Sequence, residues 1–339
     1  LRKGGYDTRR FWKAGPGEME SICRVVPPEG FRLYSIASSP VAAPGEFSEK
    51  LQLIVGGLKY FTVNSPVTRS EERFGTGSHF LEEVVQYDAQ KQRPIPLKIV
   101  PATRFSLPSD TTRPVVMFAA GSGIAPFSGF LQARANQPGQ NWLFFATRTP
   151  GQMFYQAELE KLIKAGRLEL RVAFSGVDRR MKFDGEHLAL VDGKRAHVED
   201  VMLEDENARA LWNLMRSRSE GGQGAFFDVC GQTGFARKVM DTLRDIILRF
   251  SPEPAETREA AARLRFYQLV ANHRYMQDIY TTYSPTFRNP NQFNASEVVL
   301  HNNPANGYWV VIYGKVYDLT EFIHLHPGGM KIITNNVGI

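Results

Sequence analysis

The stretch from residue 115 to residue 135 constrains the fold more than any other part of this chain. Val115–Ala120 is a continuous apolar run, typical of strands buried on both faces of a parallel sheet. It leads directly into Gly121-Ser122-Gly123-Ile124-Ala125-Pro126, and Phe127–Ala135 then has a helical pattern. Glycines after a strand let a diphosphate approach the backbone, and proline suits a first helical turn because it has no N–H to leave unpaired. Strand, turn and helix together predict a dinucleotide-binding unit.

Strands and helices continue to alternate after this unit. Such a series predicts an α/β doubly wound parallel sheet whose ligands lie at the carboxyl ends of the strands. Arg148, Ser175 and Cys230 each follow such an end, although they also have ordinary interpretations as a surface charge, a turn residue and a small buried apolar residue. The predicted strands are Trp142–Ala146, Leu168–Phe174 and Ala225–Val229, and the predicted helices are Gln156–Ala165, Ala208–Arg216 and Ala236–Arg249.

The first 111 residues have a different pattern. Short apolar runs (Leu51–Val55, Lys59–Val63, Leu97–Val100) alternate with Gly, Pro and Ser breaks, which favours an antiparallel barrel or sandwich. Within this part, Phe31–Pro40 is predicted to be a short strand that carries Arg32, Tyr34 and Ser35. A guanidinium can bind a diphosphate, a phenol can cover a flat ring and a hydroxyl can bond the ring edge. An exposed edge strand would carry the same residues.

A glycine-rich turn also occurs in this first part. Gly75-Thr76-Gly77-Ser78 precedes a helical pattern that begins near His79. Backbone N–H groups and the hydroxyls of Thr76 and Ser78 could hold a phosphate at the N-terminus of that helix. A plain helix cap is the alternative interpretation.

Composition narrows the classes of protein to which the chain can belong. Its 339 residues suffice for two or three domains with their own cores. The formal net charge of +6 is spread along the chain, which favours small anionic ligands and argues against nucleic acid. Two cysteines cannot form a disulfide framework, which indicates a reducing, cytoplasmic setting. We find neither a signal peptide nor an apolar run long enough to form a membrane segment.

Five motifs in order give residues 1 to about 282 a resemblance to the FAD- and NADPH-binding half of the diflavin reductases. That family includes cytochrome P450 reductase, sulfite reductase flavoprotein and nitric oxide synthase reductase. The resemblance implies an antiparallel β-barrel FAD domain in residues 1–111, expected to be incomplete at its N-terminus, and an NADP-binding α/β domain in residues 112–282. The motifs are Arg32-Leu33-Tyr34-Ser35, Gly75-Thr76-Gly77-Ser78, Gly121-Ser122-Gly123-Ile124-Ala125-Pro126, Val229-Cys230-Gly231 and Arg274-Tyr275-Met276-Gln277-Asp278-Ile279-Tyr280.

The resemblance also implies roles in binding the two cofactors. Arg32 and the Gly75–Ser78 loop would hold the FAD diphosphate, while Tyr34 and Ser35 would lie at the flavin ring. Gly121, Ser122, Gly123 and Pro126, together with Arg148, would hold the NADPH diphosphate.

A second set of residues would line the path of hydride transfer. The resemblance assigns this role to Ser35, Cys230 and Asp278, because the carboxylate can stabilise the positive charge that grows on the nicotinamide and the hydroxyl can bond flavin N5. Tyr280 would stack on the flavin until the nicotinamide displaces it. The alternative interpretation of Tyr280 is a core aromatic residue.

The part that would bind the 2′-phosphate of NADPH departs from the family. The family usually has Ser-Arg and then a basic-x-Tyr-x-Gln motif, whereas here Gly176 follows Ser175 and the best match is Arg195-Ala196-His197-Val198-Glu199. An inserted segment, which contains Arg179, Arg180 and Lys182, lies between the two. Ser175, Arg195 and His197 favour NADPH, while Gly176 and Glu199 leave NADH possible.

A polar, Pro-containing linker at residues 283–295 precedes a different module. Tyr308–Tyr313 and Val316–Leu319 flank Gly314-Lys315 as a hairpin, and Thr320 can cap a short helix at Glu321–Leu325. His326-Pro327-Gly328-Gly329 follows. Residues 296–339 resemble cytochrome b5, an α+β haem domain in which this motif supplies one axial ligand of haem b. We expect His326 to be that ligand and the second to lie beyond Ile339.

The preferred interpretation is an electron-transfer flavoprotein, a piece of a longer protein, in which a hydride passes from NADPH to FAD and single electrons pass on to a haem or FMN acceptor. That acceptor would lie in the same chain or in a separate protein. Three alternatives stay open: an NADH-dependent b5 reductase-like enzyme, the reductase segment of an oxygenase such as nitric oxide synthase, and an inactive remnant whose truncated barrel cannot hold FAD. Oligomeric state and membrane attachment are not predicted.

Overall fold

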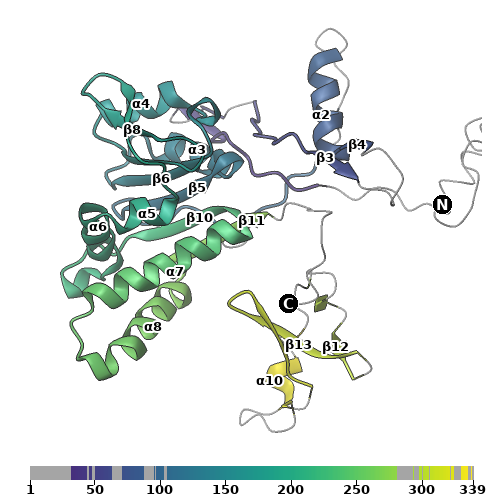
Figure 1. Ribbon diagram of the computed structural model, residues 1–339, viewed down its shortest axis with the longest axis vertical. Helices are drawn as coiled ribbons and strands as arrows, with labels where there is room; N and C mark the ends of the chain where they lie inside the picture. The colour runs from purple at the N-terminus through teal and green to yellow at the C-terminus, as the bar shows by residue number, and fades with distance from the viewer. Residues whose placement is uncertain are drawn as a thin grey trace, which may run out of the picture.

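A five-stranded sheet with helices on both faces is the largest body of the computed structural model (Figure 1). No helix among the described residues is both long and apolar enough to cross a membrane. The structure describes residues 32–43, 46–47, 50–62, 71–87, 95, 97–102, 105–280, 293, 298–299, 301–304, 306–320, 322–323, 330–334 and 337.

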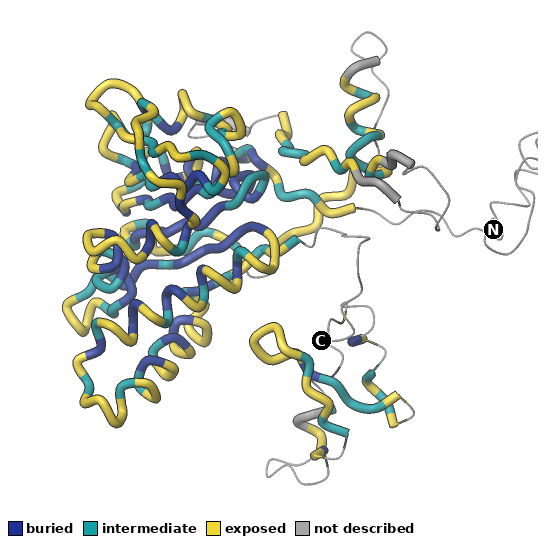
Figure 2. The backbone as a smooth tube through the Cα atoms, in the orientation of Figure 1, coloured by how far each residue is buried: buried dark blue, intermediate teal, exposed yellow. Residues whose placement is uncertain are grey.

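All neighbouring strands of this sheet are parallel, in the order β11-β10-β5-β6-β7. The central strands are almost wholly buried, as the dark blue tube in Figure 2 shows, which explains why their sequences are continuous apolar runs. The predicted doubly wound parallel sheet is confirmed. The strands are β5 (Val115–Ala120), β6 (Asn141–Thr147), β7 (Glu169–Phe174), β10 (Phe226–Gln232) and β11 (Tyr275–Tyr280).

Helices bury both faces of the sheet. On one face α3 (Ala125–Arg134) and α4 (Gln156–Lys164) contribute to a core with Met117, Leu143 and Phe145. The opposite core contains Val116, Phe144 and Phe227. The helices over that second core are α5 (Val198–Leu203), α6 (Asp205–Met215), α7 (Thr233–Phe250) and α8 (Ala255–Ala271).

The strand order places two predicted ligand segments side by side. From β5 the chain goes outward to β6 and β7, and it then returns to add β10 on the other side of β5. The turn after β5 and the Cys230-Gly231 step of β10 therefore share one end of the sheet, where open parallel sheets bind their ligands. A short 3-10 helix, η3 (Gly121–Ile124), forms that turn and leads into α3.

Several elements of the nucleotide domain go beyond the sequence prediction, among them α5 and β11. The inserted segment forms an antiparallel hairpin of β8 (Arg179–Phe183) and β9 (Leu188–Asp192). Helix α8 packs beside α7 (Figure 1). The hairpin packs near β7, one edge of the parallel sheet.

The described part of the first region contains antiparallel pairs, but these residues do not form a closed barrel. The pairs are β1 (Val41–Ala43) with β2 (Glu46–Phe47), and β3 (Lys59–Thr62) with β4 (Glu71–Phe74). Helix α2 (Thr76–Tyr87) follows, which confirms the predicted helix, although it begins at Thr76 and so includes most of the predicted glycine-rich turn. The barrel itself stays a prediction.

Three expected strands in this region differ in the structure. Leu97–Val100 is irregular and exposed, and Leu51–Val55 has only a bridge from Leu53 to Ile36. Residues 32–35 belong to no regular strand either. These predictions were wrong because an apolar run becomes a strand only where a partner strand satisfies its backbone groups.

The C-terminal module is a small antiparallel sheet of β12 (Asn302–Asn303), β13 (Gly307–Ile312) and β14 (Lys315–Asp318), with the short helix α10 (Met330–Thr334). The predicted hairpin is confirmed, with its turn at Tyr313-Gly314. Both turn residues have positive φ, 53° and 71°, as a two-residue turn between twisted strands requires. Phe322 and Ile323 form a turn, while the rest of the predicted helix lies outside the described residues, as do Cys23 and His326.

Candidate active site

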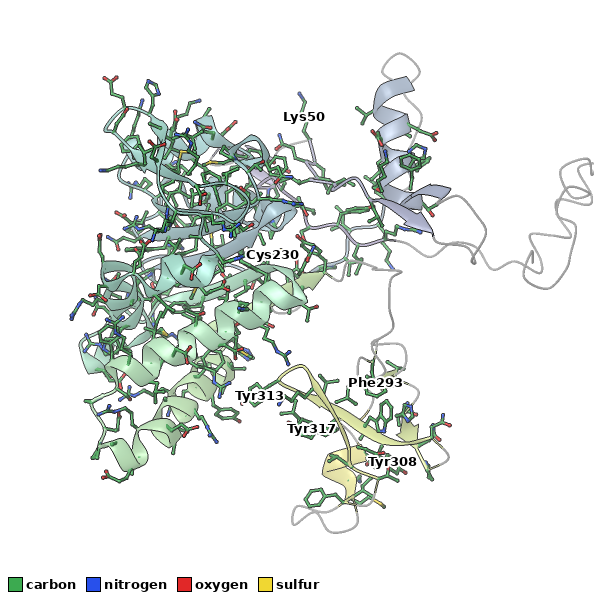
Figure 3. The ribbon with its side chains drawn as sticks, viewed as in Figure 1. Lys50, Cys230, Phe293, Tyr308, Tyr313 and Tyr317 are labelled. Carbon is green, nitrogen blue, oxygen red and sulfur yellow. The ribbon has the colours of Figure 1, made fainter. Side chains whose placement is uncertain are left out.

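Three predicted catalytic side chains meet at the edge of the sheet. The hydroxyl of Ser35 donates a hydrogen bond to Oδ2 of Asp278 at 2.7 Å, although 243 residues separate the two. The thiol of Cys230 lies 4.0 Å from the same carboxylate oxygen. Figure 3 labels Cys230 near the end of the sheet that faces the described N-terminal segments. The same oxygen of Asp278 thus accepts the hydrogen bond of the Ser35 hydroxyl and lies in contact with the Cys230 thiol.

Strand pairing brings the cysteine and the aspartate together. Cys230 of β10 lies opposite Asp278 of β11 in the parallel register, so both side chains project from the same face of the sheet. Cys230 is 1% exposed, and burial, with the negative charge of Asp278 nearby, raises the pKa of the thiol well above its usual range. The side chain therefore stays a neutral thiol at physiological pH, which is compatible with a polarisable contact and not with a thiolate nucleophile.

The glycine turn after β5 also touches Cys230. Any side chain at Gly123 would collide with the carbonyl group of Cys230, so only glycine permits this close approach. Gly121 has φ +53°, and a Cβ there would extend into open space. The turn thus packs tightly against β10 on one side and leaves room on the other, as a diphosphate site requires.

Tyr280 lies against the same turn. Its hydroxyl donates to the carbonyl oxygen of Ala120 at 3.0 Å and accepts from the Ser122 hydroxyl at 3.3 Å. The ring is half-buried in the core that contains Cys230, and burial raises the pKa of the phenol. Tyr280 therefore lies across the glycine turn, bonded to the last residue of β5 and to Ser122 of η3.

The proposed FAD residues form a second group around the start of α2. A Cβ at Gly77 would lie 2.5 Å from Cδ of Arg32 and 2.9 Å from the hydroxyl of Tyr34. Both side chains therefore pack directly over the first turn of a helix whose N–H groups favour anions. The Ser78 hydroxyl instead stabilises the backbone around the start of α2. It donates to the Gly75 carbonyl and accepts from the Leu58 N–H, each at 3.2 Å.

A third group gathers at the carboxyl ends of β6 and β7. The Gly176 N–H donates to the carbonyl of Arg148 at 2.9 Å, which joins the ends of the two strands. The Ala196 N–H donates to the carbonyl of Phe174 at 2.9 Å and so sets Arg195 and His197 next to Ser175. Arg148, Arg195 and His197 are exposed there. The structure thus unites residues that are separated by the β8–β9 hairpin in the sequence.

Other basic residues of the motifs have structural partners. Arg179 pairs with Asp192 across the hairpin, and Arg180 pairs with Glu204. Arg274 donates to the carbonyl oxygens of Ala225 and Met215 at 2.9 and 2.8 Å, and burial lowers its pKa to about 10. Arg274 therefore has a structural role, and the other two arginines are engaged in ion pairs.

Sequence reasoning missed the residues that hold the segment carrying Ser35. The Ser39 N–H donates to Oε1 of Gln132 on α3 at 2.9 Å. Nothing in the local sequence of Gln132 distinguishes it from an ordinary helix residue, since its partner lies 93 positions away.

The class of this protein follows from comparison with known families. Residues 117–241 match the model of the oxidoreductase NAD-binding domain, which covers the glycine turn and Cys230. Residues 294–339 match the model of the cytochrome b5-like heme/steroid binding domain. The chain therefore joins an oxidoreductase NAD-binding domain to a cytochrome b5-like domain.

Individual relatives make the resemblance more specific. The sulfite reductase [NADPH] flavoprotein alpha-component of Vibrio cholerae serotype O1 is 33% identical over 253 residues, which are 74% of this chain and 35% of the relative. The same component of Mannheimia succiniciproducens is 31% identical over 74% of this chain and 36% of the relative. These matches confirm the resemblance to the diflavin reductases, and the chain spans about a third of the length of these relatives.

Proposed function

We propose that this chain is the hydride-accepting part of an electron-transfer flavoprotein, taking a hydride from NADPH and delivering single electrons to a haem or FMN acceptor. The observation that supports this best is the Ser35–Asp278 hydrogen bond of 2.7 Å beside Cys230. It joins the predicted flavin segment to the end of the nucleotide-binding sheet, where the two reactants have to meet. NADPH dependence is also printed in the names of the relatives.

The residues divide the work at this meeting point. Bound FAD would supply the chemistry, because it can take up a hydride and release electrons one at a time. Asp278 places a negative charge where positive charge grows on the nicotinamide, and fixed charges of this kind need no reorganisation during the reaction. The Ser35 hydroxyl donates its hydrogen bond to Asp278, so the lone pairs of its oxygen are left to accept a hydrogen bond. Cys230 stays a neutral thiol and would offer the nicotinamide a polarisable contact surface.

The described residues fit an FAD diphosphate. Arg32 supplies a guanidinium, and Gly77 allows Arg32 and Tyr34 to pack over the N-terminus of α2. A cation, backbone N–H groups and an aromatic ring are therefore close together, which is the donor set that a flavin diphosphate and its ring would use.

The group at the ends of β6 and β7 supports NADPH over NADH. Arg195 and His197 are exposed next to Ser175, whereas Arg179 and Arg180 already have ion-pair partners in Asp192 and Glu204. Two exposed side chains that carry nitrogen donors suit a 2′-phosphate. We therefore assign Ser175, Arg195 and His197 to that phosphate and Arg148 to the diphosphate.

The electron acceptor belongs to the same proposal. The cytochrome b5-like match makes a haem in the same chain the first candidate, with His326 as one axial ligand. An FMN domain or a separate haem protein is the second candidate, since the relatives are named as components of sulfite reductase. We place the protein in the cytoplasm.

Anaerobic reduction of the FAD-loaded chain tests the proposal. We expect NADPH to bleach the flavin absorbance faster than NADH at equal concentration. Arg195→Ala should reduce this difference in rate between the two nucleotides. Arg179→Ala is the control, because Arg179 is already paired with Asp192, and it should leave the difference unchanged. A chain that binds FAD and is reduced by neither nucleotide would refute the function. Equal rates with both nucleotides would support an NADH-dependent reductase instead.

A further inference from the structure

We infer that Gln132 of α3 is a positioning residue for hydride transfer, because it holds the segment that presents Ser35 to Asp278. This inference rests on the proposed function. The segment, residues 35–39, is anchored at both ends: Ser35 donates to Asp278 at 2.7 Å, and the Ser39 N–H donates to Gln132 at 2.9 Å. Ser39 is only 4% exposed, so its N–H would be costly to leave unpaired.

The contact with α3 is close enough to set the position of the segment. A Cβ at Gly129 would lie 3.2 Å from the carbonyl oxygen of Ser38, so the helix and segment backbones are in direct contact. The side-chain amide of Gln132 also donates to the Ser128 hydroxyl at 3.4 Å, one helical turn earlier. This bond turns the amide oxygen toward Ser39.

The other side of the segment is held independently of Gln132. The N–H of Ala37, which is fully buried, donates to the carbonyl of Gln52 at 2.8 Å, and Ile36 forms its bridge with Leu53. Ala37 and Ser39 therefore have different partners, although they lie two residues apart. This difference provides an internal control for any measurement on the segment.

Helix α3 connects this support to the nucleotide site. It begins directly after η3, the turn proposed to hold the NADPH diphosphate, and Gln132 lies near its far end. The same helix thus carries the diphosphate turn and holds the flavin-side segment. Because hydride transfer depends steeply on the alignment of the reacting rings, a small shift of this segment should slow the reaction without weakening nucleotide binding.

Hydrogen exchange of individual amides provides the first test and does not depend on activity. In Gln132→Leu the Ser39 amide should exchange about fivefold to tenfold faster, as the loss of one hydrogen bond predicts. The Ala37 amide should keep its wild-type rate. Gln132→Glu retains an acceptor oxygen and should restore the wild-type rate at Ser39. An unchanged Ser39 rate in Gln132→Leu would overturn the inference.

Transient kinetics of the FAD-loaded chain provides the second test. Gln132→Leu should lower the rate of flavin reduction about tenfold and raise the isotope effect from NADPH deuterated at C4, with the dissociation constant of NADP⁺ unchanged. Gln132→Glu should recover the rate. Gln140→Leu, the same chemical change at an exposed glutamine outside α3, is the matched control. Equal slowing by the Leu and Glu variants would overturn the inference, because the acceptor would then be irrelevant.

A second variant covers the case in which Gln132→Leu does not fold. Gly129→Ala adds a Cβ at 3.2 Å from the Ser38 carbonyl and should push the segment away, which lowers the rate in the same direction. A wild-type rate in Gly129→Ala would overturn the inference. If the wild-type chain were not reduced by NADPH, the proposed function would fail, and the exchange test would still decide whether Gln132 holds Ser39.

Discussion

The two sides of the candidate site are held by different forces. Cys230 and Asp278 belong to paired parallel strands, with an extensively packed core behind them. Ser35, their counterpart, belongs to a segment with a single β-bridge and a few individual hydrogen bonds. The sheet side is therefore fixed by cooperative burial, whereas the flavin side depends on contacts that single substitutions can remove.

This contrast indicates where substitutions should act. Changes at the sheet-side site residues Cys230 and Asp278 that preserve packing should affect the chemistry alone, because the strands stay in place. Changes on the segment side should affect geometry, because no regular sheet replaces a lost contact there. Each of the following experiments tests one part of this distinction.

The largest effect is expected for Asp278→Asn. The substitution keeps an acceptor for Ser35 and removes the negative charge, so it should lower hydride transfer by about a hundredfold while leaving the fold intact. Stopped-flow reduction of the FAD-loaded chain by NADPH measures this rate. Asp245→Asn, an equal change of charge at an exposed position on α7, should have no effect. A rate within twofold of wild type would contradict the assigned role of Asp278.

A buried carboxyl in the sheet should give the second largest effect, on stability. Asp228 of β10 is fully buried, and its oxygens have no hydrogen-bond partner among the described residues. Burial raises its pKa to about 8, although the positive charge of Arg134 opposes the shift. The folded state therefore favours the protonated acid, and its free energy of unfolding should decrease as pH rises from about 4 to 8.

Asp228→Asn removes this titration. At pH 8 we expect the variant to be more stable than wild type by several kcal/mol, with the difference vanishing toward pH 4, below which wild-type Asp228 is protonated in both states. Urea unfolding at several pH values measures this. A wild-type chain whose stability is flat over that range would show that Asp228 stays ionised.

Tyr280→Ala should change the preference between nucleotides by about tenfold. The tyrosine lies across the glycine turn. Under the proposed function, the nicotinamide would have to displace its ring to reach the flavin. NADH lacks the phosphate contacts that help NADPH to do so, so it should gain more from the smaller side chain. The ratio of kcat/KM values for the two nucleotides is the measurement. An unchanged ratio would argue against displacement of the ring.

The smallest effect is expected in the C-terminal module. Gly314 in the β13–β14 turn has φ +71°, so Gly314→Ala should destabilise the hairpin by about 1 kcal/mol. Faster hydrogen exchange of the β13 amides would report it. Gly151→Ala makes the same change where open space surrounds the site and φ is ordinary, and it should cost nothing measurable. Equal exchange in both variants would show that the turn tolerates a side chain.

Most of the nucleotide-binding sheet is predictable because its strands are buried on both sides. β5, β6 and β10 are mainly apolar runs and the edge strand β7 ends in one, Val172–Phe174. The predicted bounds of all four agree with the structure to within a few residues. β11 is absent from the predicted strands, because this edge strand has only one buried residue, Tyr275, and therefore no apolar run. Helix α8 and the β8–β9 hairpin lie at the periphery, where the apolar pattern is weaker.

The motifs identify the types of residue that the chemistry needs, and these follow from local patterns: a glycine turn after a buried strand, a cysteine at a strand end, an Arg-x-Tyr-Ser run. Which of them meet is set by the tertiary fold. Asp278 reaches Ser35 across 243 positions, and Gln132 reaches Ser39 across 93, through the pairing of β10 with β11 and the packing of α3. Local sequence patterns cannot predict such partners, because contacts between distant segments form only when the core brings those segments together.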